Sequence, residues 1–131
     1  MKVAFRVDAG TAIGSGHLSR CLTLAEELIT NGVTQCFFIM RAHKGSYAEL
    51  ITKKGYEVKL LPLEISPNYS ANYEQWVGAN LDQDAHDALE YLSALDFGKS
   101  DWLIIDHYGI DHQFEEVVGS LQLSIGVIDD L

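Results

Sequence analysis

The sequence predicts an α/β fold in which helices cover both faces of a parallel sheet, in a Rossmann-like, doubly wound arrangement. Segments with the pattern of strands alternate along the chain with segments of helical periodicity. One strand is continuously apolar, as expected when helices cover both faces of a sheet. The length of 131 residues suits one domain, residues 1–131, and right-handed crossovers between the strands give the doubly wound layout.

The first half of the chain contains three predicted strands and two predicted helices. Residues 2–7 (KVAFRV) form the first strand, and the glycine-rich residues 8–16 form a loop. Residues 17–30 place apolar side chains on one face of a helix, namely Leu18, Cys21, Leu22, Ala25, Leu28 and Ile29. Asn31-Gly32 ends this helix. The apolar run 34–40 (TQCFFIM) is the second strand, followed by a helix over 46–54 and a strand over 56–61.

The second half begins with the least regular stretch, residues 62–78, which holds both prolines and predicts a surface loop with a short helical turn. A helix over 82–95 follows, with Ala85, Leu89 and Leu92 facing inward. The remaining elements are a strand over 101–106 (DWLIID), a helix over 111–121 and a strand over 123–129 (LSIGVID). Domain boundaries usually fall in flexible linkers, so a chain that stops beside a strand is expected to continue into further sequence.

Composition and charge limit the possible partners. The net charge of −10 argues against nonspecific binding to nucleic acid, which needs a basic face. An anionic small ligand stays possible, because backbone N–H groups at a helix start bind phosphate. No stretch reaches the length of a membrane span, and the N-terminus lacks the pattern of a signal peptide. Cys21 and Cys36 lie in apolar runs, which predicts buried free thiols and a cytoplasmic protein.

Ligands of open α/β sheets bind beyond the carboxyl ends of the strands, and this rule selects the candidate site. Asp8 ends the first predicted strand, and the loop after it leads to Gly14, Ser15, Gly16 and His17. The fourth strand ends at Asp106-His107-Tyr108, and the fifth at Asp129-Asp130. We expect these residues to share one edge of the sheet.

The glycine loop fits neither of the two common nucleotide motifs. Ser19 stands where a dinucleotide-binding G-x-G-x-x-G needs its third glycine, and no Gly-Lys-Ser/Thr follows. The sequence therefore disfavours NAD and ATP, and no cofactor is expected. A glycine-lined turn before a helix lets a phosphate or sugar approach the backbone, although a plain connecting turn explains the same residues equally well.

His17 is the strongest single candidate for catalysis. It falls in the first turn of a helix, where the positive end of the helix dipole favours neutral imidazole. A neutral imidazole suits a general base, although a capping or surface histidine fits the spacing too. Asp8 is positioned to fix the tautomer of His17, or else to cap its own loop.

Asp106-His107-Tyr108 places two acid–base groups and a phenol directly after an apolar strand, although Asp106 in an Asx-turn would also explain the pattern. His17, Asp106, His107, His112 and Asp129 are potential metal ligands. The chain has no H-x-x-x-H on a helix and no C-x-x-C, so no metal site is expected.

The three histidines away from the predicted site are His43, His86 and His112. They are predicted to be ordinary polar surface residues.

Three segments resemble a known family in sequence. Residues 5–25 (FRVDAGTAIGSGHLSRCLTLA) are similar to an N-terminal pattern of Arg-x-Asp, Gly-x-Gly-His and Arg-Cys-Leu-x-Leu-Ala, and 103–111 (LIIDHYGID) and 127–131 (VIDDL) to two further blocks. The family is that of the UDP-2,4-diacetamido-2,4,6-trideoxy-β-L-altropyranose hydrolases of pseudaminic acid biosynthesis, with the related spore-coat polysaccharide biosynthesis proteins. The resemblance runs through the whole chain in order. Gly10 stands where the family commonly has serine, a difference expected to have little effect.

The resemblance implies the N-terminal half of a GT-B-like enzyme, in which two Rossmann-like domains enclose the active site. A C-terminal nucleotide-binding domain, absent from these 131 residues, would hold most of the UDP. His17 would activate water for inverting attack on the anomeric carbon, without a metal, and Tyr108 would line the sugar site. The other substrate-binding candidates are Asp8, Gly14, Ser15, Gly16, Asp106 and His107. A GT-B glycosyltransferase domain and a non-catalytic sugar-nucleotide-binding domain remain the alternatives.

Overall fold

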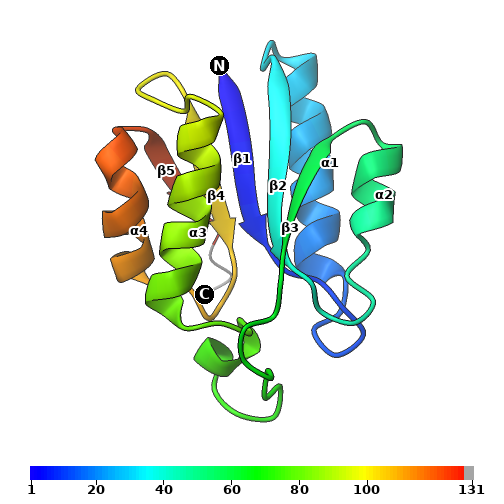
Figure 1. Cartoon of the computed structure of the whole chain (residues 1–131). Coiled ribbons are helices and arrows are strands. Elements are labelled where there is room, and N and C mark those ends of the chain that lie inside the picture. Colours follow the sequence, from blue (N-terminus) through cyan, green and yellow to red (C-terminus); the bar gives the residue numbers. More distant parts are fainter. Residues whose placement is uncertain (129–131) are drawn as a thin grey trace.

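The computed structural model describes residues 1–128 and has an α/β fold with five parallel strands (Figure 1). The strand order is β3-β2-β1-β4-β5, which is the doubly wound order that the alternating pattern predicts. The elements are β1 (Lys2–Val7), α1 (Gly16–Thr30), β2 (Gln35–Arg41), α2 (Ala48–Lys53), β3 (Glu57–Leu61), the 3-10 helix η1 (Tyr73–Trp76), α3 (Leu81–Ala94), β4 (Trp102–Asp106), α4 (His112–Val118), the 3-10 helix η2 (Gly119–Leu121) and β5 (Ser124–Val127).

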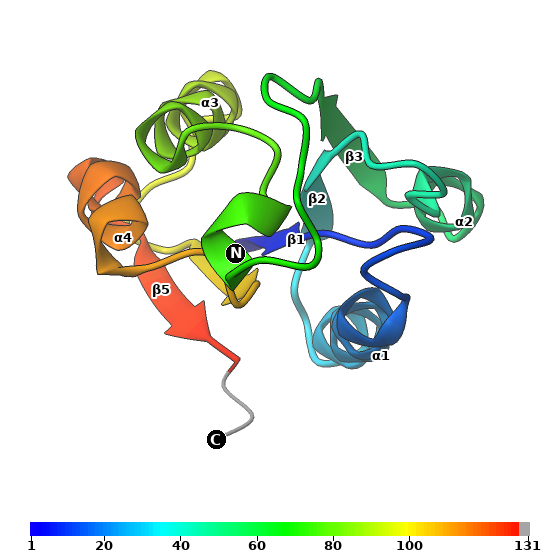
Figure 2. The ribbon, with the colours of Figure 1, turned by 90° about the horizontal axis from the view of Figure 1, so that it is seen from below.

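Helices cover both faces of the sheet, α1 and α2 on one and α3 and α4 on the other (Figure 2). Side chains alternate between the two faces along each strand. On β1, Val3, Phe5 and Val7 pack with α1 and α2, whereas Ala4 packs with α3 and α4. The stacked rings of Phe5 and Phe38, with centroids 4.9 Å apart, lie in the core under α1.

The predicted elements are confirmed, with shifts of one or two residues at most ends. The helix predicted over 46–54 begins at Ala48, after Tyr47 adopts a left-handed φ of 63°. One difference is larger. The helix predicted over 111–121 divides into α4 and η2, because a glycine at 119 weakens the last turn.

The predicted thiols and the predicted irregular loop are also as expected. Cys21 and Cys36 are buried free cysteines, and residues 62–80 contain only the single turn of η1. Asp129 and Asp130, expected at the end of the fifth strand, lie outside the described residues. Within residues 1–128, no helix combines the length and the apolar composition of a bilayer span.

The carboxyl ends of the strands form one edge, which η1 and its flanking loop cover (Figure 1). In this parallel sheet Val7 pairs with Asp106, and Arg6 with Ile105. Paired residues point to the same face of a sheet. Asp106 therefore faces α1 together with Val7, whereas Asp8, one residue further along the chain, faces α3 and α4. This alternation determines which side chains can meet.

Candidate active site at the carboxyl edge of the sheet

The centre of the candidate site is a histidine–aspartate pair. His17 lies in the first turn of α1, as predicted, and its side chain is 15% exposed. Its Nδ1 is 2.6 Å from Oδ1 of Asp106, the last residue of β4. The expectation that Asp8 orients His17 is wrong, because Asp8 projects from the opposite face of the sheet. Asp106 fixes the imidazole instead, with Nδ1–H donating and Nε2 left as the acceptor nitrogen.

Arg20 holds Asp106 from the next turn of α1. Its Nε is 2.5 Å from Oδ2 and its Nη2 is 2.6 Å from Oδ1, in a two-pronged contact with the carboxylate. Burial by itself raises the pKa of Asp106, but the hydrogen bonds from Arg20 and His17 outweigh it and lower that pKa to about 2. Asp106 is therefore a carboxylate across the physiological range.

The Cys21 thiol also contacts Asp106, with Sγ 3.6 Å from Oδ2. Burial, followed by the nearby Asp106 charge, raises the pKa of Cys21. The sulfur stays a thiol and donates a weak hydrogen bond, so it is no nucleophile at neutral pH.

Two tyrosine side chains pack beside His17 at this edge of the sheet. The ring of Tyr108 meets the ring of His17 edge-on, with centroids 4.6 Å apart, and Tyr73 of η1 lies 4.9 Å from Tyr108. A cavity of about 10 Å³ lies beside His17 and Tyr108 and is lined by Asp8, Ile13, His17, Trp76, Asp106, His107 and Tyr108. Such a volume holds about one water molecule.

Asp8 and His107 form a second pair on the other side of this cavity. Nε2 of His107 is 2.8 Å from Oδ2 of Asp8, and the backbone N–H of Gly109 donates to Nδ1 over 2.9 Å. Because Nδ1 accepts, the imidazole proton lies on Nε2 and is donated to Asp8. Burial raises the pKa of Asp8, but the Arg6 charge and the hydrogen bonds from His107 and His43 hold that pKa well below its ordinary value.

Behind Asp8 lies a buried network of charges that the sequence analysis missed. The guanidinium of Arg6 binds Asp8 at 2.7 Å and Asp84 at 2.9 Å, and Nε of Arg41 binds Asp84 at 2.7 Å. Arg41 also donates its backbone N–H to Asp8 over 2.8 Å and its Nη2 to Asp87 over 2.7 Å. The side chains of Arg6, Arg41 and Asp84 are fully buried. A signal existed, because Arg6 and Arg41 occupy inward strand positions and Asp84 shares the buried stripe of α3 with Ala85 and Ala88.

His43 was predicted to be a surface residue, and this is wrong. It is 3% exposed, its Nδ1 is 2.5 Å from the hydroxyl of Tyr69, and its Nε2 is 3.4 Å from Oδ2 of Asp8. His43 follows the end of β2 at the same edge, where the loop 62–80 covers it. His86 and His112 are exposed, as predicted.

The structure brings five of the eight predicted site residues to one cavity: Asp8, His17, Asp106, His107 and Tyr108. The glycine loop instead folds on itself, since the N–H of Gly14 donates to the carbonyl of Gly10 over 2.7 Å. Ser15 precedes α1 and lines a separate groove of about 280 Å³ between α1 and α2. Gly14 and Gly16 have open space beside their Cα atoms but do not line the cavity.

Gly10 is more constrained than the sequence suggests. A Cβ at position 10 would lie 2.9 Å from the carbonyl oxygen of Lys44 and 3.1 Å from Cβ of His43. A serine at position 10, which is common in the resembling family, would thus require this backbone to move. Within residues 1–128, no three His, Cys, Asp or Glu side chains gather as a metal site would require.

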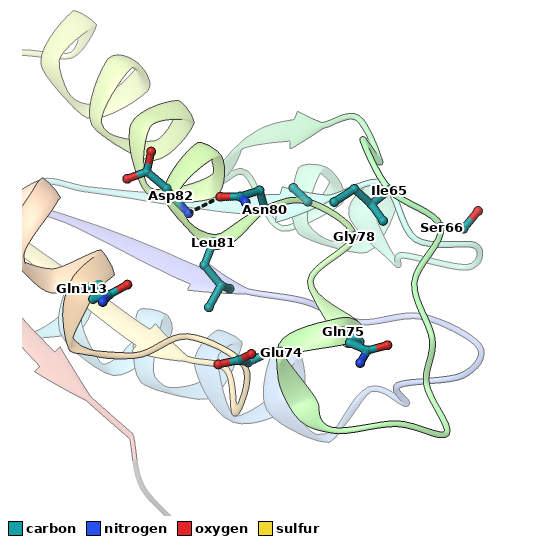
Figure 3. A pocket seen from close by; sticks show the side chains of 10 residues that line it. Ile65, Ser66, Glu74, Gln75, Gly78, Asn80, Leu81, Asp82 and Gln113 are labelled. Atoms are coloured by element: carbon teal, nitrogen blue, oxygen red, sulfur yellow. Dashed lines mark hydrogen bonds between the residues drawn. The ribbon is translucent and has the colours of Figure 1, made fainter.

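A larger pocket of about 420 Å³ lies beside the candidate site, between η1 and the N-terminal ends of α3 and α4 (Figure 3). Its walls carry Ile65, Ser66, Glu74, Gln75, Gly78, Ala79, Asn80, Leu81, Asp82 and Gln113. The Asn80 side chain caps α3 by accepting from the N–H of Asp82. We place the chemistry in the smaller cavity, because the histidine–carboxylate pairs lie there and the larger pocket has none.

No protein-family model and no curated protein matches this chain.

Proposed function

We propose that the chain is the N-terminal Rossmann-like domain of a GT-B-like nucleotide-sugar hydrolase, which releases UDP from a UDP-linked diacetamido-trideoxy sugar. The observation that carries the proposal is the 2.6 Å contact between His17 Nδ1 and Asp106 beside the ring of Tyr108. It lies at the carboxyl edge of the sheet, where ligands of such folds bind. The same three residues belong to the two sequence blocks that resemble the UDP-sugar hydrolases.

The chemistry follows from the tautomer of His17. With Nδ1–H donated to Asp106, Nε2 keeps the lone pair that can accept a proton. Nε2 takes a proton from water as the water oxygen forms a bond to the anomeric carbon. The bond from that carbon to the phosphate oxygen breaks, and UDP leaves with the electron pair. Asp106 stabilises the imidazolium that results, and Arg20 holds Asp106 in position.

The departing diphosphate needs positive charge or backbone dipoles close by. The described cavity offers two carboxylates, Asp8 and Asp106, which suit a base but not a diphosphate. We therefore propose that a C-terminal nucleotide-binding domain supplies most of the UDP contacts and completes the cleft, with Tyr108 lining the sugar site. The 131 residues alone should then hydrolyse little or no substrate.

The proposed reaction uses no metal or other cofactor, since a histidine base and a good leaving group suffice for it. The cytoplasm is the proposed location. The proposed substrate is a nucleotide sugar made inside the cell. The buried free thiols of Cys21 and Cys36 also suit a reducing compartment.

The test is UDP release by the complete gene product and its His17→Ala variant, with products identified by NMR. General-base catalysis contributes about 10²- to 10⁴-fold. The rate of UDP release by the variant should therefore fall at least about 10²-fold. His86→Ala is the matched control, because His86 is exposed on α3. Undiminished UDP release by His17→Ala would overturn the role of the base. A glycoside product would identify a glycosyltransferase, and binding without turnover a non-catalytic domain.

A further inference from the structure

Residues 64–78 form an Ω-loop, called the strap below, that crosses the carboxyl edge of the sheet. Its two ends are joined, because the N–H groups of Glu64 and Ile65 both donate to the carbonyl of Gly78, over 2.7 and 2.9 Å. Figure 2 shows the η1 turn of the strap in front of the end of β1. Loops of this kind are compact units that can move without unfolding the domain.

Aromatic contacts seat the strap on the candidate site. Tyr73 packs on Tyr108 with centroids 4.9 Å apart and on Trp76 with centroids 4.8 Å apart. Near its other end, the hydroxyl of Tyr69 meets Nδ1 of His43. Trp76 is part of the wall of the 10 Å³ cavity that contains His17. A cavity of that size has no room for a sugar ring, so a nucleotide sugar that binds beside His17 needs the strap to move.

The strap lies closest to the edge of the sheet at Gly109, and this contact is called the seat of the strap. A Cβ at this position would collide with the carbonyl oxygen of Tyr73 and lie 3.1 Å from Cε1 of His107. The φ of Gly109 is not in the left-handed region. Close approach of the strap backbone is thus the reason that position 109 needs a glycine.

One polar atom of the strap is left without a partner. The indole Nε1 of Trp76 is buried and has no hydrogen-bond partner among the described residues. A buried N–H without an acceptor destabilises the folded state, so an acceptor atom of a ligand would stabilise this one. Trp76 lines the same cavity as His17 and Asp106.

We propose that the strap is a lid that opens to admit substrate, and that its closure presents the Trp76 indole N–H to an oxygen of the nucleotide sugar beside His17. The identity of the ligand rests on the proposed function, whereas the opening of the lid does not. Trp76 is then a substrate-positioning residue, delivered by the segment that also excludes water.

The lid is tested without ligand by the fluorescence of Trp76. The chain has two tryptophans, so Trp102→Phe leaves Trp76 as the single probe. In this background Gly109→Ala removes the seat and should raise acrylamide quenching of Trp76 by about twofold or more. Gly119→Ala is the control, since a Cβ there meets nothing within 4 Å, and it should leave quenching unchanged.

Unchanged quenching in a folded Gly109→Ala protein would overturn the lid. If circular dichroism shows that this variant does not fold, Tyr69→Phe replaces it. Tyr69→Phe removes the contact with His43 at the other end of the strap and creates no clash. It should raise quenching by a smaller factor, and the absence of any rise would again overturn the lid.

The donor is tested in the complete gene product with Trp76→Phe, which keeps an aromatic ring and removes the N–H. We expect kcat for UDP release, or the affinity for the UDP-sugar measured by calorimetry, to fall about tenfold. Trp102→Phe is the control, because Trp102 is 39% exposed at the start of β4. If Trp76→Phe changes neither quantity, the donor role is wrong while the proposed hydrolysis stands. If the wild type binds the UDP-sugar without hydrolysing it, the proposed hydrolysis is wrong. The ratio of the affinities of the wild type and Trp76→Phe then still tests the donor role of Trp76. If the wild type does not bind the UDP-sugar, the proposed hydrolysis and the donor role are both wrong.

Discussion

Two carboxylates stand at the ends of neighbouring strands, and each has an arginine and a histidine as partners. Asp106 binds Arg20 and His17, and Asp8 binds Arg6 and His107. The difference is access to solvent. The side chains of Arg20 and His17 are 33% and 15% exposed, whereas those of Arg6 and His107 are 0% and 3% exposed.

The two pairs therefore suit different tasks. A carboxylate that holds a partly exposed histidine can support proton transfer with a substrate. The buried charges of Arg6, Asp8, Arg41 and Asp84 pair with one another, and they fix the ends of β1 and β2 to α3 through Asp84. The same residue types become a candidate catalytic pair on one face of the sheet and a structural network on the other, according to burial.

The largest expected effect comes from Asp106→Asn on the catalytic side. An amide cannot hold the imidazole in the same tautomer or stabilise its charge, and equivalent changes in histidine–aspartate systems cost about 10⁴-fold in kcat. We expect a loss of about 10³- to 10⁴-fold in UDP release by the complete gene product, with the fold retained by circular dichroism. Asp82→Asn, at an exposed position of α3, is the control. Retention of more than a tenth of the activity would contradict the pairing.

Asp84→Ala should disrupt the buried charge network on the other face of the sheet. It leaves the buried guanidinium groups of Arg6 and Arg41 without the carboxylate that joins them. Loss of one member of a buried ion pair destabilises a protein by about 3–5 kcal/mol, measurable by urea unfolding. Asp82→Ala, two residues away on the surface, should cost far less. A loss below about 1 kcal/mol for Asp84→Ala would show that the network is not structural.

The sequence identified both carboxylates but not their partners. The rule that ligands bind at the carboxyl ends of strands placed Asp8, His17 and Asp106 at one edge, and the structure agrees. Which carboxylate meets His17 depends on the strand register, because pairing of Val7 with Asp106 turns Asp106 toward α1. Hydrophobic periodicity gives the elements but not the face on which each helix lies, so it could not make this choice.

Long-range contacts explain what else escaped prediction. His43 is buried because Tyr69, 26 positions later, lies over it, and no local pattern records such a contact. The strap has no periodicity, and its position depends on Tyr73 meeting Tyr108. Arg6 and Asp84 are different, since charged residues at inward positions of a strand and a helix could have indicated a buried pair.

Low pH should destabilise the folded protein through the buried carboxyl groups on both faces of the sheet. Their pKa values are lower in the folded protein than in the unfolded one. Burial raises the pKa of Asp84, but the ion pairs with Arg6 and Arg41 outweigh it and keep that pKa below its ordinary value; the pKa of Asp8 is also lowered, and that of Asp106 falls to about 2. Their stabilisation is complete above the unfolded pKa of about 4. It is lost as pH falls through the folded values.

Urea unfolding at a series of pH values checks this prediction. The free energy of unfolding should change little between about pH 7 and 5 and fall steeply between about pH 4 and 2. Asp84→Asn, which cannot titrate, should flatten that fall in proportion to its own share. A variant with the same steep dependence as the wild type would mean that Asp84 carries none of the acid sensitivity.

The smallest expected effect is that of Arg20→Lys, which tests how Arg20 contributes to the pair of His17 and Asp106. Lysine keeps the positive charge but cannot reproduce the two-pronged contact that Nε and Nη2 make with Asp106. Asp106 would then hold His17 less firmly, and kcat for UDP release should fall about tenfold. A merely structural arginine would lower stability without lowering kcat. If Arg20→Lys keeps the wild-type kcat while its free energy of unfolding falls, Arg20 does not act through Asp106.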